Sequence, residues 1–290
     1  MTNELSDIFI VGHGTKSAMG QEQLRTLVEM CSKHFQGRKV GYGYLELADP
    51  HLETALRGFI TKDTKEITVI PLVLLGAGHA KSDIAGAVEA ARGEFTTIEF
   101  RYGRDLSISI ELIDAFMERY RPIDPSQEKD EEAILLVGRG SSDPDANSEV
   151  AKIARMITEI HQISIVESAF ISLTTPSVPQ GLERAYRLGA KRITVLPYFL
   201  FAGALIDRIS QQAKEWSVTH QDVTLGIHGE LGPHEVLVEL IAQRIAEADG
   251  DRVQMSCDRC IYRIRTKNFE SNFGQPLVVA YPNDNHHHHH

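Results

Sequence analysis

The strongest constraint in this sequence is an internal repeat. Three landmarks, each placed where an apolar run meets a turn, recur later in the chain at one offset of 126 residues. Similarity that keeps register through three separate landmarks indicates the duplication of one folding unit. The matched pairs are residues 12–14 and 138–140, 44–47 and 170–173, and 67–71 and 193–197.

The repeat divides the 290 residues into two domains, in line with the usual prior of roughly 150 residues per domain. We expect an N-terminal domain over residues 1–122 and a C-terminal domain over 133–248, joined by a polar segment that contains proline. Residues 249–290 form an extension outside the repeat. A content of 42% hydrophobic and 24% charged residues is typical of a globular chain with a full core.

Short apolar strands alternate with amphipathic stretches of helical length in the first copy. Strands are expected near residues 7–12, 39–47, 67–75 and 97–102, with helices beginning near Ser17, His51 and Lys81 and a fourth across Leu106, Ile110, Ile113 and Met117. Continuously apolar strands are typical of a parallel sheet that is covered on both faces. The sequence therefore predicts an α/β fold of two duplicated, doubly wound parallel-sheet domains, with ligands at the carboxyl ends of the strands.

Charge and cysteine content limit the partners. Thirty basic against forty acidic residues give a net charge of −10, so broad attraction to nucleic acid or to an anionic membrane surface is not expected. The longest apolar runs, residues 67–77 and 193–206, are shorter than the roughly 20 residues that span a bilayer. The three cysteines and the polar start of the chain indicate a cytoplasmic location.

The two copies differ at the expected ligand-binding edge. At three positions at or just beyond a strand end, the first copy has a residue that can bind a metal or transfer a proton, and the second copy does not. Two imidazoles and a carboxylate suit a divalent transition metal and leave its coordination sphere open. The three pairs are His13 and Arg139, Glu46 and Ser172, and His79 and Leu205.

Each of these residues also has a purely structural interpretation. His13 lies between two glycines and could cap the following helix, His79 could be a satisfied polar group under a helix start, and Glu46 could point from an edge strand into solvent. Their joint loss from the second copy favours the functional interpretation. His51, which follows Pro50 at a helix start, is expected to be exposed and receives little functional weight.

Three ordered motifs resemble those of the sirohydrochlorin chelatases: residues 11–15, 44–50 and 71–84. Residues 137–144 are similar to the degenerate half of the two-domain members, and the resemblance covers about residues 7–247. It implies a chelatase-like fold and the insertion of a divalent metal ion into sirohydrochlorin, a tetrapyrrole with eight carboxylates. It also implies that the tetrapyrrole binds in a cleft between the two halves and that the chemistry needs no cofactor.

The resemblance implies a role for each candidate residue. His13 would be a metal ligand and proton acceptor, and His79 the second imidazole. Glu46 would contact the metal or the macrocycle and help to remove the pyrrole protons. The stretch Leu75, Gly76, Ala77 and Gly78 would let the backbone come close to the flat ring.

The extension bears on the choice of metal. Residues 255–260, with the spacing Met-x-Cys-x-x-Cys and a later histidine run, resemble the tail of long-form cobaltochelatases of the cobalamin pathway, where this motif is associated with an iron–sulfur cluster. We therefore expect Co²⁺, with Fe²⁺ for sirohaem as the alternative. Cys257 and Cys260 are too few for a four-cysteine cluster in one chain, so either two chains of a homodimer pool their pairs or another ligand completes the site. A disulfide or a zinc site is the alternative, and the run His286–His290 is either native or a tag.

Two other classes of function compete. A non-catalytic metal or tetrapyrrole carrier would bind both ligands without accelerating insertion. A phosphatase of the histidine class would use His13 to accept a phosphoryl group, but such enzymes need an arginine directly before the histidine and this chain has Gly12.

Overall fold

The structure is a computed structural model that describes residues 6–78, 82–120 and 131–250. Strands and helices alternate along the chain, as the repeat predicts. The first copy contains β1 (Asp7–Gly12), α1 (Ala18–His34), β2 (Val40–Tyr44), α2 (Leu52–Phe59), β3 (Glu66–Leu72), α3 (Ile84–Glu94), β4 (Glu99–Tyr102) and α4 (Ile110–Met117). The second contains β5 (Glu132–Gly138), α5 (Pro144–His161), β6 (Ile165–Phe170), α6 (Val178–Arg187), β7 (Arg192–Pro197), α7 (Ala204–Val218), β8 (Thr224–Ile227) and α8 (Glu235–Asp249).

The strands form two parallel sheets with the same topology. The strand orders are β2-β1-β3-β4 and β6-β5-β7-β8, and every pairing within them is parallel. The predicted α/β class with two doubly wound sheets is confirmed. Two strands end earlier than predicted. β2 ends at Tyr44, and Leu47, predicted as its last residue, takes a left-handed φ of 64° that a strand does not have. β3 ends at Leu72, where the Val73 amide turns back and donates to the Pro71 carbonyl.

The described residues belong to two compact units that do not coincide with the two repeats. Of the described residues, unit 1 draws on 6–14, 35–78, 82–105 and 242–250, and unit 2 on 15–34, 106–120 and 131–241. Both α1 and α4 therefore belong to unit 2, and α8 ends in unit 1. The domain boundaries expected above follow the repeats and stay a prediction.

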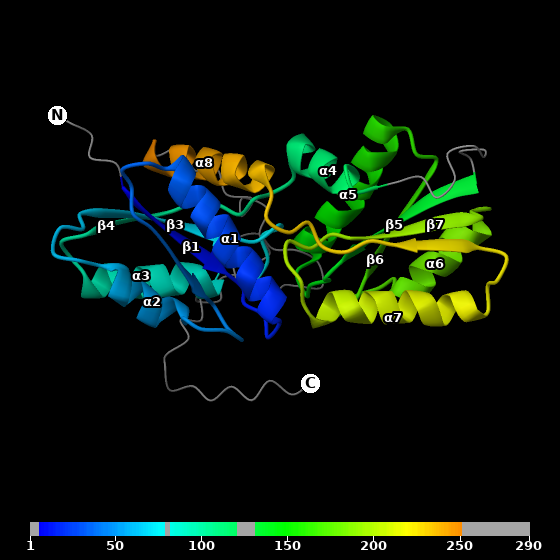
Figure 1. Cartoon of the computed structure of the whole chain (residues 1–290), viewed down its shortest axis with the longest axis horizontal. Coiled ribbons are helices and arrows are strands. Elements are labelled where there is room, and N and C mark those ends of the chain that lie inside the picture. Colours follow the sequence, from blue (N-terminus) through cyan, green and yellow to red (C-terminus); the bar gives the residue numbers. More distant parts are fainter. Residues whose placement is uncertain (1–5, 79–81, 121–130, 251–290) are drawn as a thin grey trace. The chain divides into compact units, whose positions relative to one another are not determined.

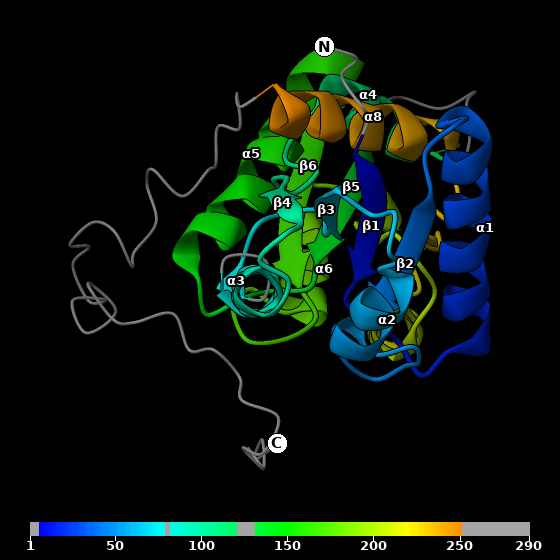
Figure 2. The same cartoon turned by 90° about the vertical axis from the view of Figure 1, so that its left-hand side faces the viewer.

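Unit 1 buries its apolar side chains on both faces of the first sheet. On one face, alternate residues of β1 and β3 pack against α2 and α3, and the C-terminal half of α8 lies on the opposite side (Figures 1 and 2). This alternation follows from the two-residue period of a strand. The cluster facing α2 and α3 includes Phe9, Val11, Ile67, Val69, Leu52, Leu56, Phe59, Ile84 and Val88.

Unit 2 repeats this arrangement around the second sheet. Alternate residues of β5 and β7 pack against α6 and α7, and α4 and α5 lie on the other side of the sheet (Figure 1). In α4, Phe116 packs against Tyr198, which follows β7, with ring centroids 4.4 Å apart. The start of α1 is held by the loop after β7, where the Ala202 amide donates to Gln23 (2.8 Å). Gly20 is required there, since a Cβ on it would lie 2.2 Å from the Ala202 carbonyl oxygen. No helix among the described residues is both long enough and apolar enough to cross a membrane.

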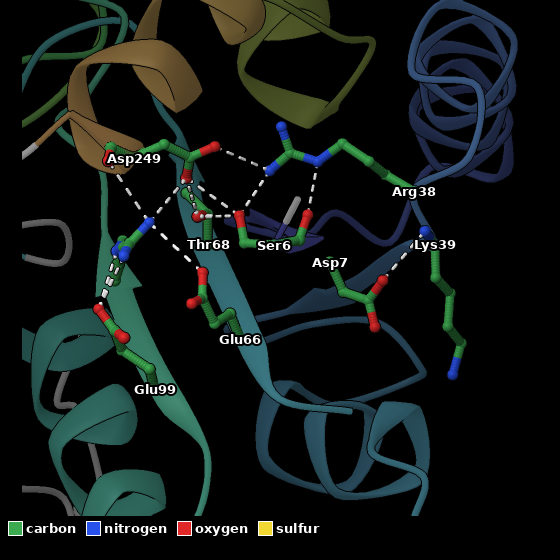
Figure 3. Close-up of polar contacts among 9 residues, drawn as sticks. Ser6, Asp7, Arg38, Lys39, Glu66, Thr68, Glu99 and Asp249 are labelled. Atoms are coloured by element: carbon green, nitrogen blue, oxygen red, sulfur yellow. Dashed lines mark hydrogen bonds and ion pairs between the residues drawn. The ribbon is translucent and has the colours of Figure 1, made fainter. Parts of the chain in front are cut away.

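A polar cluster at the amino ends of β1 and β3 holds the end of α8 (Figure 3). The Asp249 carboxylate accepts hydrogen bonds from Ser6 (3.0 Å) and Thr68 (2.7 Å) and pairs with Arg38 (3.2 Å). Arg101 lies 3.7 Å from the same carboxylate. An acidic side chain at a helix C-terminus is disfavoured by the helix dipole, so these partners offset an unfavourable position. Burial lowers the pKa of Arg38, and Asp249 acts in the opposite direction.

We expect Asp249→Asn to lower the free energy of unfolding by about 2 kcal/mol, because it leaves the Arg38 guanidinium, only 8% exposed, without its carboxylate. Urea unfolding at pH 7 measures the change. The exposed Asp63 provides the control, and Asp63→Asn should stay within about 0.5 kcal/mol of the wild type. Equal stability of the Asp249 variant and the wild type would show that the cluster contributes nothing.

Candidate active site

The candidate site lies at the carboxyl ends of β1 and β2, where backbone hydrogen bonds join two loops. The Leu45 amide donates to the Gly12 carbonyl (2.9 Å), and the Glu46 amide donates to the His13 carbonyl (3.0 Å). Gly14 has a φ of 103°, and a Cβ on it would lie 1.7 Å from the Glu46 carbonyl oxygen. Only glycine fits this approach, so the motif Gly-His-Gly is what brings His13 beside Glu46.

The side chains of His13 and Glu46 meet. His13 Nε2 lies 3.3 Å from Glu46 Oε1, and the two side chains are 27% and 41% exposed. His13 Nδ1 lies 3.4 Å from the Gly14 carbonyl oxygen. In the tautomer whose Nδ1 donates to that oxygen, Nε2 is the ring nitrogen that can bind a metal ion, and it lies beside the carboxylate. Imidazole and carboxylate together are a ligand set for a divalent transition metal.

The second copy builds the same backbone without this chemistry. The Ser172 amide donates to the Arg139 carbonyl (3.0 Å), and a Cβ on Gly140 (φ 88°) would lie 1.9 Å from the Ser172 carbonyl oxygen. Leu173 repeats the left-handed φ of Leu47, at 63° against 64°. The two loops therefore match in backbone and differ in the side chains that could bind a metal.

The loop after β3 brings a further set of predicted residues to the same edge. In the order β2-β1-β3-β4, the chain adds β2 on one side of β1 and then β3 and β4 on the other side. The point between β1 and β3 is therefore the topological switch point, where doubly wound sheets bind their ligands. His13 follows β1, and residues 75–78 follow β3. Gly76 is buried, whereas Leu75, Ala77 and Gly78 are half-buried. Among the described residues, a Cβ on Gly78 would meet no atom within 4 Å, so their packing leaves room around it.

Several predicted residues lie outside the described part of the chain. These are His79, Cys257, Cys260 and the run His286–His290, so their roles stay predictions. Among residues 6–78, 82–120 and 131–250, no group of three or more metal-binding side chains occurs. His13 and Glu46 are two of the three residues predicted for the metal site, and the structure brings them together, whereas the third, His79, is not among the described residues. Cys31 is buried, and burial raises the pKa of its thiol to about 12, as suits a structural residue.

Another histidine, His51, lies at this edge, and the sequence pattern gives it little functional weight. His51 is exposed, as expected, and it forms an isolated parallel bridge with Tyr44, the last residue of β2. Its counterpart in the second copy is Ser177. The comparison of the copies that singled out His13 would also have found His51, had it been extended past the strand ends into the helix starts.

Comparison with known proteins matches this chain to one family over both repeats. The CbiX family profile matches residues 7–123 and again 133–248. A sirohydrochlorin cobaltochelatase from Priestia megaterium is 32% identical over 90% of this chain and 85% of its own length. A sirohydrochlorin ferrochelatase from the same organism is 29% identical over 82% of this chain and 88% of its own length.

Solved structures share the fold. The sirohydrochlorin chelatase SirB from Bacillus subtilis subspecies spizizenii, in complex with cobalt, is 26% identical and has a TM-score of 0.71. The match covers 85% of this chain and 96% of that one. A structure of SirB from Bacillus subtilis with Fe³⁺ has a TM-score of 0.72 at 24% identity, which shows the fold alone.

Paired parallel sheets with an imidazole and a carboxylate at one carboxyl edge, together with these relatives, define a metal chelatase. The chain belongs to the CbiX family. The predicted resemblance to the chelatases is therefore confirmed, and the protein is an enzyme rather than a non-catalytic carrier or a histidine-class phosphatase.

We expect Glu46→Gln to weaken binding of Co²⁺ by roughly ten- to a hundredfold, because the amide keeps the size of the side chain but loses the charge that attracts the ion. Calorimetric titration without tetrapyrrole measures the affinity. Ser172→Ala, at the matching position of the second copy, should bind Co²⁺ like the wild type. Equal affinity of the Glu46 variant and the wild type would remove Glu46 from the site.

Proposed function

We propose that this chain inserts Co²⁺ into sirohydrochlorin at a site formed by His13, Glu46 and His79. The observation that carries the proposal is the 3.3 Å approach of His13 Nε2 to Glu46 Oε1 at the carboxyl ends of β1 and β2. The second copy keeps the same backbone hydrogen bonds and has arginine and serine instead. The metal chemistry is thus confined to one of two matching loops.

Metal insertion exchanges two pyrrole N–H protons for one divalent ion, so it needs a ligand that presents the ion and bases that accept the protons. His13 Nε2 holds the ion, and in the tautomer that does so Nδ1 donates to the Gly14 carbonyl oxygen, 3.4 Å away. As the ion passes to the macrocycle, His13 Nε2 is freed to accept one pyrrole proton, and Glu46, which contacts the ion or the macrocycle, accepts the other. Both side chains are partly exposed, so the released protons can pass to water.

The number of protein ligands matters as much as their identity. Two imidazoles and one carboxylate leave positions of the metal open for water and for the nitrogens of the incoming macrocycle. Such a site exchanges its ion, whereas a closed site would store it. His79, as the second imidazole, completes this set in the proposal and follows directly after Gly78.

Residues 75–78 form the proposed surface for the macrocycle. They follow β3 beside the switch point, and three of the four have either no side chain or a single methyl group. A backbone with such small side chains can come close to a flat ring. The open space at Gly78 supports this role.

The preference for cobalt is supported by the relatives and the tail. The cobaltochelatase of Priestia megaterium is 32% identical over 90% of this chain, and the extension carries the Met-x-Cys-x-x-Cys spacing. Fe²⁺ is the second candidate, favoured by the ferrochelatase at 29% identity over 82% of the chain. Imidazole and carboxylate bind both ions, and affinity rises only modestly from Fe²⁺ to Co²⁺. The iron–sulfur cluster at Cys257 and Cys260, a homodimer and a cytoplasmic location stay predictions from the sequence.

The choice of metal is tested by anaerobic insertion assays with Co²⁺ and Fe²⁺ on the full chain, followed by the absorbance of the metallated product. We expect a higher kcat/KM with Co²⁺ than with Fe²⁺. The same mixtures without protein give the uncatalysed rate. A higher kcat/KM with Fe²⁺ would replace the proposal by the sirohaem alternative, and a rate equal to that in buffer would end both.

We expect His13→Ala to lower kcat/KM for insertion at least about a hundredfold, because it removes both a metal ligand and a base. Arg139→Ala changes the equivalent position of the second copy and should leave the rate within about threefold of the wild type. Circular dichroism checks that both variants fold. A folded His13 variant with the wild-type rate would contradict the assignment.

A further inference from the structure

His51 occupies a helix position that normally carries a different kind of residue. It is the N-cap of α2, with extended backbone angles of −64° and 141°, and its side chain makes no capping hydrogen bond. The first turn of a helix leaves backbone N–H groups without partners, and serine, threonine, aspartate or asparagine at the N-cap satisfies one of them. An exposed histidine that forgoes this bond is therefore unfavourable for stability.

The second copy has the stabilising residue at the matching position. Ser177 caps α6 by accepting from the Gln180 amide (3.5 Å), while the Gln180 side chain accepts from the Ser177 amide (2.9 Å). The backbone leading into the two helices is the same. Tyr44 donates to Pro50 (2.9 Å) as Phe170 donates to Pro176 (2.8 Å), and each then bridges the N-cap residue. Because serine fits this backbone in one copy, the histidine in the other calls for a reason other than helix stability.

His51 lies on the edge that carries the metal site. Gly12, which precedes His13, pairs with Tyr44, and Tyr44 pairs with His51. Two steps between neighbouring strands place the Cα atoms of Gly12 and His51 roughly 10 Å apart. An exposed imidazole thus stands within unit 1, close to the pair formed by His13 and Glu46.

We propose that His51 is a further metal-binding residue, one that takes the substrate ion from solvent and releases it beside His13 and Glu46. This inference rests on the proposed function, since it concerns the supply of metal to that site. A single exposed imidazole binds a divalent transition metal weakly and exchanges it readily. Weak binding next to the stronger site leaves that site's equilibrium affinity unchanged, but it speeds the capture of ions from solvent and so raises kcat/KM for Co²⁺.

The test is His51→Ser, which places the serine of the second copy on the matching backbone. Its helix gains a cap, so we expect the Tm to rise by about 1 to 3 °C. The KM for Co²⁺ should rise about three- to tenfold, while kcat at saturating Co²⁺ and the KM for sirohydrochlorin stay unchanged. If His51 had only a structural role, His51→Ser would not raise both the Tm and the KM for Co²⁺.

Two matched variants serve as controls. Ser177→His introduces the opposite change into the second copy and should lower the Tm without altering any KM. His34→Ser removes an exposed imidazole at the end of α1 and should leave the KM for Co²⁺ unchanged. If His34→Ser raises the KM for Co²⁺ as much as His51→Ser does, the effect comes from general metal binding by surface histidines and the inference is wrong.

The remaining outcomes also decide the inference. An unchanged KM for Co²⁺ in His51→Ser overturns it. So does a higher KM for sirohydrochlorin, which would mean that His51 contacts the tetrapyrrole carboxylates. An unchanged or lower Tm overturns the capping argument. If the wild type inserts no metal, the proposed function fails, and Co²⁺ titration of the wild type and His51→Ser without tetrapyrrole still tests whether His51 binds the ion.

Discussion

The site depends on one backbone contact, the hydrogen bond from the Glu46 amide to the His13 carbonyl. It sets the register of two loops that leave neighbouring parallel strands, and with the register it sets which side chains face each other. The contact is tight enough to require glycine at position 14, where a Cβ would lie 1.7 Å from the Glu46 carbonyl oxygen. The proximity of imidazole to carboxylate therefore depends on the Gly-His-Gly turn, and that turn depends on the pairing of the two strands.

The second copy has the same backbone contact without the histidine and the glutamate. Gly140 makes the same close approach to the Ser172 carbonyl oxygen at 1.9 Å, and the Ser172 amide bonds the Arg139 carbonyl as its counterpart does in the first copy. A loop that served only the proposed metal site would have no physical need to keep this geometry once the histidine and the glutamate are absent. Its presence in both sheets means that the turn also contributes to folding, by joining adjacent strand ends where the ladder stops.

Much of this arrangement follows from the sequence, because period and register are local properties. The repeat predicts two parallel sheets, and the rule that strand ends meet at one edge predicts that His13 and Glu46 lie together, as they do. The compact unit to which a helix belongs is not a local property of the sequence. The apolar face of α1 shows that the helix is buried, but its contact with Ala202, far along the chain, assigns it to unit 2. The early end of β2 escaped prediction for another reason, since leucine seldom adopts the left-handed φ seen at Leu47.

The two ends of the first sheet differ in how far their polar side chains are buried and hydrogen-bonded. At the amino ends, Asp249, Ser6 and Thr68 satisfy one another and Arg38, so a charged helix end is held with little exposure. At the carboxyl ends, His13 and Glu46 stay partly exposed, and α2 begins without a side-chain cap. Polar groups that bind substrate cannot be fully satisfied by the protein itself, because an incoming ion must find open coordination. The well-bonded end thus offsets the stability forgone at the end where, in the proposed function, the ion binds and leaves.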